Sequence, residues 1–300
     1  MSADRPRIGI DLGGTKVEGI VLNGDGEILE RMRRPTPQDD YEETLETVCN
    51  LVHDLESGHG ELPVGIGTPG SISPATGRIK NANSTCLNGR PLREDLERRL
   101  ARPVRLANDA NCFALSEAID GAGANRRVVF GVILGTGVGG GVIIEGKPLT
   151  GLNAIAGEWG HNPLPDPADA ERPGPDCYCG KRGCIESWLS GPGMSADHAR
   201  TAGVTLTAKE IAASETPEAA KTVARYSHRL ARALSVVINV LDPDCIVLGG
   251  GLSNARTLYD RVPELWEAWV FSDRVDTPLL PPIHGDSSGT RGAARLWPHD

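Results

Sequence analysis

The sequence predicts an α/β fold built from two domains. Short apolar runs rich in β-branched residues, such as Arg7–Leu12 and Cys245–Leu248, alternate with segments of helical apolar spacing such as Tyr41–Leu55. The chain has 300 residues, of which 39% are hydrophobic, and this is enough for two packed domains. Two similar glycine-rich turns mark related halves, so we expect a smaller domain at residues 1–120 and a larger one at 121–300.

The first half should begin with a hairpin. Arg7–Leu12 is a buried strand by its composition, Gly13–Thr15 is a tight turn, and Lys16–Leu22 returns as the second strand. Further expected elements of this half are a helix over Tyr41–Leu55, a strand over Pro63–Thr68, a helix over Pro91–Leu100, a strand over Val104–Ala107 and a helix over Asn111–Ile119.

The second half repeats the pattern with a longer glycine turn. A strand over Val128–Leu134 leads into Gly135–Gly141, and a strand resumes at Val142. Pro163–Pro175 is rich in proline, aspartate and alanine, which is typical of an exposed loop. The remaining expected elements are a short helix with a capping box at Thr207–Glu210, a helix over Glu218–Leu241 with Thr216 as its N-cap, a strand over Cys245–Leu248, a helix starting near Asn254 and a last helix over Gly289–Trp297. This C-terminal helix, near 288–300, can pack back on the first domain.

Composition excludes several classes of protein. A net charge of -9 argues against binding to nucleic acid, because that requires a basic face. No apolar run approaches the length of a membrane span, and no signal-peptide pattern precedes the first strand, so we expect a cytoplasmic protein without a membrane partner. An odd total of seven cysteines argues against a disulfide framework. We interpret four of them as core thiols: Cys49, Cys86, Cys112 and Cys245.

The other three cysteines and one histidine have the spacing of a metal site. His161 lies upstream of Cys177, Cys179 and Cys184, and glycines stand at the bends between the thiols. Three thiolates and one imidazole can close on a tetrahedral zinc ion with no open position for water, which predicts a structural site. The alternatives are buried or redox-active cysteines, or a strained disulfide in the Cys-x-Cys pair. Acidic residues flank the cluster at Glu158 and Glu186.

The two glycine turns suggest phosphate binding. Gly135-x-Gly137-x-x-Gly140 matches the dinucleotide fingerprint, but that fingerprint requires a helix after the turn, and here a strand follows. No Walker loop is present. Glycine turns within hairpins can still direct successive backbone N–H groups at a phosphate, although either turn alone could be a plain tight turn. Asp11, beside the first turn, favours a nucleotide with its Mg²⁺ over simple turn capping.

The ordered set of motifs resembles the ROK family of sugar kinases, in the actin-like ATPase superfamily. Asp11–Lys16 is similar to the first phosphate motif of the family, Gly135–Gly141 to the second, and Gly249–Gly251 to the adenosine-side motif. Gly157–His161 and Cys177–Glu186 together resemble its zinc signature. The resemblance implies these nucleotide-binding residues: Asp11, Gly13, Gly14, Thr15, Lys16, Gly135, Thr136, Gly137, Gly139, Gly249, Gly250 and Gly251.

The resemblance also implies a two-domain actin-like (ribonuclease H-like) fold with a zinc knuckle, a homodimer, and phosphoryl transfer from ATP with Mg²⁺ to a hexose. Asp109, between an expected strand and an expected helix, would be the general base; a plain helix N-cap is the alternative. His161 would bind zinc through one nitrogen and the sugar through the other. The implied sugar-binding residues are Asn83, Asn108, Glu158, His161 and Glu186.

Three segments suggest which sugar is used. Asn81–Thr85, Trp159–Pro163 and His284–Gly289 most resemble bacterial fructokinases that also accept mannose, which implies fructose 6-phosphate as the product. Glucokinases belong to the same family, and its N-acetylglucosamine kinases share segments such as Asn108–Cys112.

Non-enzymatic functions were weighed as alternatives. Sugar-responsive repressors of the family carry an additional N-terminal helix-turn-helix, and only Met1–Pro6 precede the first expected strand here. A non-catalytic sugar sensor would be expected to lose Asp109 or a glycine turn, and a zinc-knuckle interaction module would not need the nucleotide hairpins. We therefore expect an enzyme.

Overall fold

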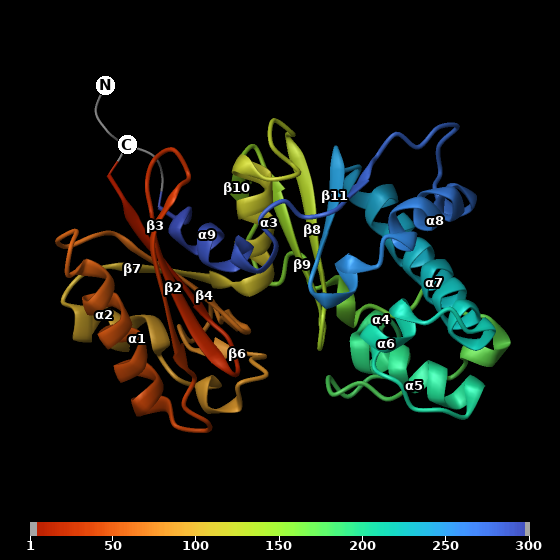
Figure 1. Cartoon of the computed structure of the whole chain (residues 1–300), viewed down its shortest axis with the longest axis horizontal. Helices are drawn as coiled ribbons and strands as arrows, with labels where there is room; N and C mark the ends of the chain where they lie inside the picture. The colour runs from red at the N-terminus through yellow and green to blue at the C-terminus, as the bar shows by residue number, and fades with distance from the viewer. Residues whose placement is uncertain (1–4, 298–300) are drawn as a thin grey trace. The chain divides into compact units, whose positions relative to one another are not determined.

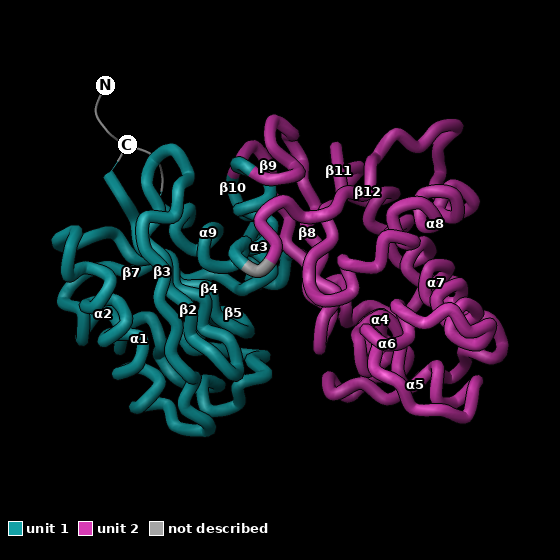
Figure 2. Tube along the Cα trace, in the orientation of Figure 1, with its two compact units in different colours: residues 1–120, 147–156, 286–300 teal, residues 121–146, 157–285 magenta. Residues whose placement is uncertain are grey.

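The computed structural model describes residues 5–297 and divides the chain into two compact units (Figures 1 and 2). The first unit comprises Met1–Asp120, Lys147–Ala156 and Asp286–Asp300, and the second comprises Gly121–Gly146 and Gly157–Gly285. The segment Lys147–Ala156 differs from the expectation, which placed it in the C-terminal domain. It belongs to the first unit because Lys80 Nζ donates a hydrogen bond to the Asn153 carbonyl at 3.0 Å and because its strand, β10 (Lys147–Pro148), contacts α3 (Asp109–Asp120).

The first unit is built on a mixed five-stranded sheet of order β3-β2-β1-β4-β7. The hairpin strands are antiparallel to one another, whereas β1, β4 and β7 run parallel, so their carboxyl ends lie at the same edge. The strands are β1 (Arg7–Leu12), β2 (Lys16–Leu22), β3 (Ile28–Pro35), β4 (Val64–Thr68) and β7 (Val104–Asn108), with a separate small ladder of β5 (Ser71–Ile72) and β6 (Ile79–Lys80).

Helices cover both faces of this sheet. The apolar residues of α1 (Tyr41–Glu56) and α2 (Leu92–Leu100) form one core with the buried isoleucines of β1. On the other face lie α3 and α9 (Ser288–Ala294), which contact each other (Figure 1). Gly9 permits the close approach of α9, since a Cβ there would stand 1.9 Å from the Thr290 carbonyl oxygen.

The second unit contributes strands in the order β9-β8-β11-β12. The β8–β9 pair is an antiparallel hairpin, and β11 and β12 run parallel to β8. A strand therefore follows the glycine turn, but it begins at Val138, four residues earlier than expected, so Gly139, Gly140 and Gly141 lie in the strand and not in the turn. The strands are β8 (Val128–Leu134), β9 (Val138–Ile144), β11 (Cys245–Gly249) and β12 (Leu279–Leu280).

The helices of the second unit pack into one core with this sheet. Thr216 caps the longest of them by accepting a hydrogen bond from the Ala219 amide, and Asp242 ends it in a left-handed conformation before Pro243. The capping box at Thr207 and Glu210 is confirmed. The helices are α4 (Ile185–Leu189), α5 (Gly191–Ala202), α6 (Ala208–Ala213), α7 (Pro217–Leu241) and α8 (Thr257–Trp266).

Short 3₁₀ turns join these elements: η1 (Thr85–Leu87), η2 (Trp159–His161), η3 (Asp169–Glu171), η4 (Gly251–Asn254), η5 (Glu267–Trp269) and η6 (Gly285–Ser287). The helix expected near Asn254 is divided into η4 and α8. The last helix ends at Ala294, three residues before the expected Trp297. None of the helices in the described part of the chain has the length and apolar composition that a membrane span requires.

Candidate functional site

In the first unit, two carboxylates lie at the carboxyl edge of the sheet. Asp11 of β1 pairs with Gly67 of β4, and Gly67 pairs with Ala107 of β7, so Asp11 lies two strands away from the end of β7. Burial raises the pKa of Asp11 to about 6, and the negative charges of Asp109 and Glu18 add to this effect, while Lys16 opposes it. Because Asp109 directly follows β7, both predicted residues lie at the carboxyl edge of the same sheet.

Asp109 is solvent-exposed and is the first residue of α3. The Ala110 amide donates hydrogen bonds to Asp109 Oδ1 at 2.8 Å and to Asn108 Oδ1 at 2.9 Å. Asn108 Nδ2 in turn donates to the Gly70 carbonyl at 3.0 Å. The start of α3 thus fixes both predicted side chains through main-chain groups. The helix begins two residues earlier than expected, which makes Asp109 part of its first turn.

Hydrogen bonds to its carbonyl oxygens hold the first glycine turn in place. The carbonyl oxygens of Gly13, Gly14 and Thr15 accept hydrogen bonds from Thr36 Oγ1, Gln38 Nε2 and the Thr36 amide at 2.7–3.1 Å. Within residues 5–297, no acceptor is found for the Gly14 and Thr15 amides. Such paired amides can bind an anion.

Lys16 is held by a residue that the sequence analysis did not single out. Its Nζ lies 3.3 Å from Glu18 Oε2. The Glu18 side chain is only 2% exposed and also contacts Arg33 Nε at 2.6 Å and Arg31 Nη1 at 3.7 Å. A charged residue inside the apolar run Lys16–Leu22 was the available signal, because a buried carboxylate requires cationic partners.

Asn83 lies near the first glycine turn. It is exposed and lines a pocket of about 250 Å³ together with Gly14 and Ser84. Ser84 Oγ is 3.7 Å from the position that a Cβ of Gly14 would take. The structure therefore brings Asn83 to the turn; none of the hydrogen bonds found among the described residues joins its side chain to Asp109.

In the second unit, the turn between β8 and β9 is closed by a hydrogen bond from the Gly135 amide to the Gly137 carbonyl at 3.0 Å. The Val138 amide donates to Glu186 Oε2 at 2.9 Å. Thr136 is exposed, and its amide and that of Gly137 find no acceptor in the described part of the chain. Gly139, which was predicted to belong to the turn, lies in β9 and accepts a hydrogen bond from Trp159 Nε1 at 3.0 Å.

The four predicted metal ligands converge. The ligand atoms of His161, Cys177, Cys179 and Cys184 all lie within 4.8 Å of one another. His161 Nδ1 is 3.6 Å from Cys177 Sγ, and Cys179 Sγ is 3.6 Å from Cys184 Sγ. Tetrahedral zinc requires about 3.8 Å between two sulfurs and about 3.6 Å between sulfur and nitrogen. The donor set and its spacing therefore fit zinc. Of the four cysteines predicted to be core thiols, Cys49, Cys112 and Cys245 are buried, whereas Cys86 is only half-buried.

The polypeptide around the cluster orients the thiols. The Cys177 amide donates to the Lys181 carbonyl at 2.8 Å, and Gly180 takes a left-handed conformation with φ of 85°. A backbone hydrogen bond from Lys181 lowers the pKa of Cys179. Both glycines of the knuckle, Gly180 and Gly183, thus permit backbone conformations that other residues rarely adopt.

Tyr178 contacts one predicted sugar-binding residue of the second unit and feels the charges of two others. Its hydroxyl is 3.0 Å from His161 Nε2, the nitrogen that does not face the thiols. Partial desolvation, followed by the negative charges of Glu186 and Glu158, raises the pKa of Tyr178 to about 12, although the residue as a whole is 74% exposed. His161 thus contacts this phenol, and the charges of Glu158 and Glu186 act on it. Sequence analysis missed Tyr178 because the middle residue of Cys-x-Cys carries no ligand requirement.

The proline-rich segment before the knuckle is anchored more firmly than expected. Leu164 is buried, and Glu171 accepts hydrogen bonds from Arg229 Nε at 2.7 Å and from Arg232 Nη2 at 2.8 Å. The Arg229 guanidinium also lies 4.3 Å from the centre of the Trp188 ring. The prediction of an exposed loop was thus wrong at Leu164 and Glu171, because two arginines of α7 hold this segment.

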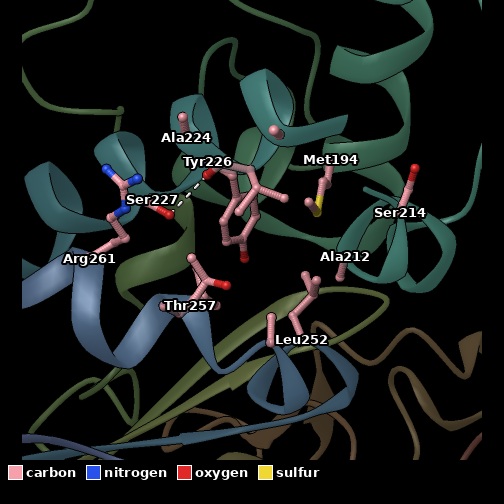
Figure 3. A pocket seen from close by; sticks show the side chains of 13 residues that line it. Met194, Ala212, Ser214, Ala224, Tyr226, Ser227, Leu252, Thr257 and Arg261 are labelled. Carbon is pink, nitrogen blue, oxygen red and sulfur yellow. Dashed lines mark hydrogen bonds between the residues drawn. The ribbon is translucent and has the colours of Figure 1, made fainter. Parts of the chain in front are cut away.

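The third glycine segment adjoins a cavity. Gly249 ends β11 in the core, Gly250 has a φ of 78° and packs on the Leu134 carbonyl, and Gly251 opens η4. The next residue, Leu252, lines a cavity of about 220 Å³. Figure 3 shows its walls: Met194 of α5, Ala212 and Ser214 at the end of α6, Ala224, Tyr226 and Ser227 of α7, Leu252 of η4, and Thr257 and Arg261 of α8.

The fold and the sites together define a class. The sheet of the first unit carries a glycine turn and two carboxylates. The second unit carries its own glycine turn, four side chains that could bind a metal ion, and a small cavity. This is the actin-like class of phosphotransferase fold that the sequence predicts.

Comparison with known proteins identifies the family. The model of the ROK family matches residues 7–300, and the chain belongs to this family of sugar kinases. N-acetyl-D-glucosamine kinase of Shigella flexneri is 41% identical over 305 residues, which cover 96% of this chain and 98% of that protein. The enzyme of the same name from Escherichia coli strain K12 / DH10B is 42% identical over 300 residues, with the same coverage of both chains.

Solved structures agree with the family assignment. The ROK hexokinase from Thermus thermophilus is similar with a TM-score of 0.84 and 29% identity, covering 96% of each chain. A ROK family glucokinase from Streptomyces griseus, in complex with glucose and AMPPNP, has a TM-score of 0.78 and 28% identity, covering 97% of this chain and 98% of the other. The predicted fold class is confirmed.

Proposed function

We propose that the protein transfers the γ-phosphate of ATP to a hexose hydroxyl, with Asp109 as the general base. The observation that carries this proposal is the position of Asp109, which is exposed at the start of α3 and fixed through the Ala110 amide. A positioned carboxylate can accept the hydroxyl proton as the phosphoryl group is transferred. Because the transition state is loose, little basicity is required, so a carboxylate of ordinary strength suffices.

The nucleotide would be held by backbone amides and by the cavity of the second unit. The amides of Gly14 and Thr15 in one turn, and of Thr136 and Gly137 in the other, are suited to phosphate oxygens. The apolar walls beside Gly249–Gly251, with a few hydroxyl groups, suit a flat purine base. Asp11 would hold Mg²⁺ through water, and the ion would neutralise the phosphate charge.

The sugar would be bound by Asn83, Asn108, Glu158, His161 and Glu186. Zinc would serve as a scaffold: it would fix His161 through Nδ1, so that Nε2 could bind a hydroxyl. In the structure Nε2 faces the Tyr178 hydroxyl. The Tyr178 side chain is 74% exposed and is thus able to turn away or to share the sugar hydroxyl.

Two hexoses are supported by different observations. Fructose, with mannose as a second substrate, is supported by the resemblance of Asn81–Thr85, Trp159–Pro163 and His284–Gly289 to fructokinases. N-acetylglucosamine is supported by the names of relatives that are 41% and 42% identical over nearly the whole chain. We propose fructose as the main substrate, N-acetylglucosamine as the alternative, and a cytoplasmic homodimer as the working form.

A coupled assay of ATP consumption tests the proposal. The purified, zinc-loaded protein is assayed with fructose, mannose, glucose and N-acetylglucosamine, and kcat/KM is compared. The highest kcat/KM with fructose supports the main proposal, and the highest with N-acetylglucosamine supports the alternative. Absence of turnover with every hexose, in protein that retains zinc, would reject the kinase function in favour of a sugar sensor.

A further inference from the structure

The turn between β8 and β9 holds a carboxylate from a distant part of the chain. The Val138 amide donates to Glu186 Oε2 at 2.9 Å. A Cβ added to Gly137 would stand 2.7 Å from the same oxygen, closer than real Cβ atoms come to another heavy atom. Gly135, in the same turn, meets only Ile133 Cγ2 at 3.9 Å. A Cβ at position 137 would therefore displace the Glu186 carboxylate, whereas position 135 has room for a side chain.

The start of β9 makes similar contacts with the segment that carries Glu158 and His161. A Cβ at Gly160 would stand 2.4 Å from the Val138 carbonyl oxygen, and one at Gly140 would stand 2.7 Å from the Gly157 carbonyl oxygen. Trp159 Nε1 donates to the Gly139 carbonyl at 3.0 Å. The glycines at the beginning of β9 thus make room for the polypeptide that bears the proposed sugar ligands.

The charge of Glu186 determines which groups can accept a hydrogen bond from the Val138 amide. A carboxylate oxygen already accepts its hydrogen bond, and a phosphate oxygen at the same amide would meet a like charge at contact distance. The bond to Val138 uses Oε2, and a carboxylate has a second oxygen with its own lone pairs. This arrangement leaves Glu186 Oε1 able to accept a hydrogen bond from a sugar hydroxyl while Oε2 stays fixed.

We infer that Gly137 and the Val138 amide are positioning groups for the sugar, acting through Glu186. The Gly137–Val138 corner fixes the carboxylate, and the phosphate contacts of this turn are made without the Val138 amide. This inference deepens the proposed function and rests on it, because it takes Glu186 to be a sugar ligand. The absence of a side chain at Gly137 thus serves sugar recognition, although this glycine belongs to a motif associated with phosphate.

The variant Gly137→Ala tests the assignment. Its Cβ displaces the Glu186 carboxylate, so the KM for the hexose should rise by roughly tenfold or more, the loss expected for one charge-assisted hydrogen bond. The KM for ATP should stay within about twofold of the wild-type value. Gly58→Ala is the matched control, because a Cβ there meets nothing within 4 Å and its φ lies outside the left-handed region. Zinc content and thermal unfolding are measured on every variant.

A double variant separates positioning from general damage. Glu186→Ala removes the atoms with which the Cβ would clash, so Gly137→Ala combined with Glu186→Ala should have the same hexose KM as Glu186→Ala alone. This pair should also fold with normal zinc content even if Gly137→Ala alone does not. An additional loss in the double variant, or failure of the double variant to fold, would overturn the inference.

The kinetic pattern distinguishes this inference from the proposed function. A rise in the KM for ATP with an unchanged KM for the hexose would assign Gly137 to the phosphate and reject the positioning role, while the kinase function would stand. Absence of wild-type turnover with every hexose would reject the proposed function itself.

Discussion

Asp11 of β1 and Glu18 of β2 are direct partners across the antiparallel ladder, so two carboxylates share one face of the first sheet. Lys16, two residues before Glu18, lies 3.3 Å from the Glu18 carboxylate and partly offsets the charge repulsion on Asp11. The main chain of Gly289 closes the site from the side of α9, since a Cβ there would stand 3.1 Å from Asp11 Oδ2. This crowding of charge has measurable consequences for stability.

Asp11→Asn should stabilise the fold at neutral pH. The pKa of Asp11 is about 6 in the folded protein against an ordinary value of 3.8, so the folded state loses stability as pH rises through this interval. Removing the charge should therefore raise the free energy of unfolding by roughly 2 to 3 kcal/mol at pH 7 and by progressively less as pH falls to about 4. Urea unfolding at pH 7, 5.5 and 4.5 measures the effect. A gain that does not depend on pH would contradict this explanation.

Glu18→Gln should weaken nucleotide binding by releasing Lys16. We expect the KM for ATP to rise roughly three- to tenfold with a smaller change in kcat, since one charged contact that orients a phosphate-binding ammonium is lost. Glu30→Gln is the control, because Glu30 pairs at 3.4 Å with His59 and is 34% exposed. In a Lys16→Met background, Glu18→Gln should have no further effect on the KM for ATP. An undiminished effect there would show that Glu18 acts through another group.

Asp109→Asn should abolish turnover without unfolding the protein. The amide keeps the hydrogen bond from Ala110 but cannot take a proton, so kcat should fall roughly a hundredfold or more. Hexose binding, followed by intrinsic tryptophan fluorescence, and zinc content should stay close to wild type. An Asp109→Asn enzyme with normal kcat would reject the assignment of the base.

Cys179→Ala should remove both the metal and the activity. Three remaining ligands bind zinc much less tightly, and His161 loses the contact that would orient its ring. We expect Tm to fall by about 5 to 10 °C, with metal content measured by atomic absorption. Cys86→Ala is the control. Cys86 lies in the first unit and far in sequence from the cluster, so this variant should retain bound zinc. Full activity of metal-free Cys179→Ala would exclude a scaffold role for the ion.

Arg229→Met should destabilise the second unit more than a surface pair would. The Arg229 side chain is 3% exposed and contacts Glu171, which is 10% exposed, and Asp197, which is 2% exposed. Breaking such a buried network costs about 3 kcal/mol or more, because it leaves carboxylates with fewer partners. Asp54→Asn breaks the exposed pair with Arg34 at 2.9 Å and should cost no more than about 1 kcal/mol. Urea unfolding of both variants gives the comparison.

Local chemistry explains which features could be predicted. Strands such as Arg7–Leu12 and Lys16–Leu22 were predicted with their exact limits, because a turn bounds each apolar run. The metal cluster could be predicted because Cys177, Cys179 and Cys184 are close in sequence and carry the ligand atoms themselves. By contrast, β3 (Ile28–Pro35) was missed because it is an edge strand without buried residues, and charged side chains occupy four of its eight positions. The helix α5 was missed because it begins with Gly-Pro-Gly, although Ser190 caps it.

Relationships between distant residues could not be predicted. The pairing of Asp11 with Glu18 needs the hairpin register, and the bond between Val138 and Glu186 joins residues 48 positions apart. A glycine within a strand, such as Gly9, indicates that another segment can approach the backbone closely, but it does not specify which segment. In the structure this segment is α9. Groups close in sequence, such as the three cysteines of the cluster, could thus be predicted to lie together, whereas contacts between distant segments could not.

The contact between Gly9 and α9 also bears on how the protein is synthesised. The face of β1 that carries Gly9 is covered by Thr290 and Ala294, which the ribosome adds some 280 residues later. Domains commonly fold in the order in which they emerge, with the N-terminal one first. Here the second unit can finish folding before the first, while the part of the first sheet around Gly9 remains uncovered until α9 has been made. A nascent chain that stalls after β12 would therefore expose this face to chaperones and proteases.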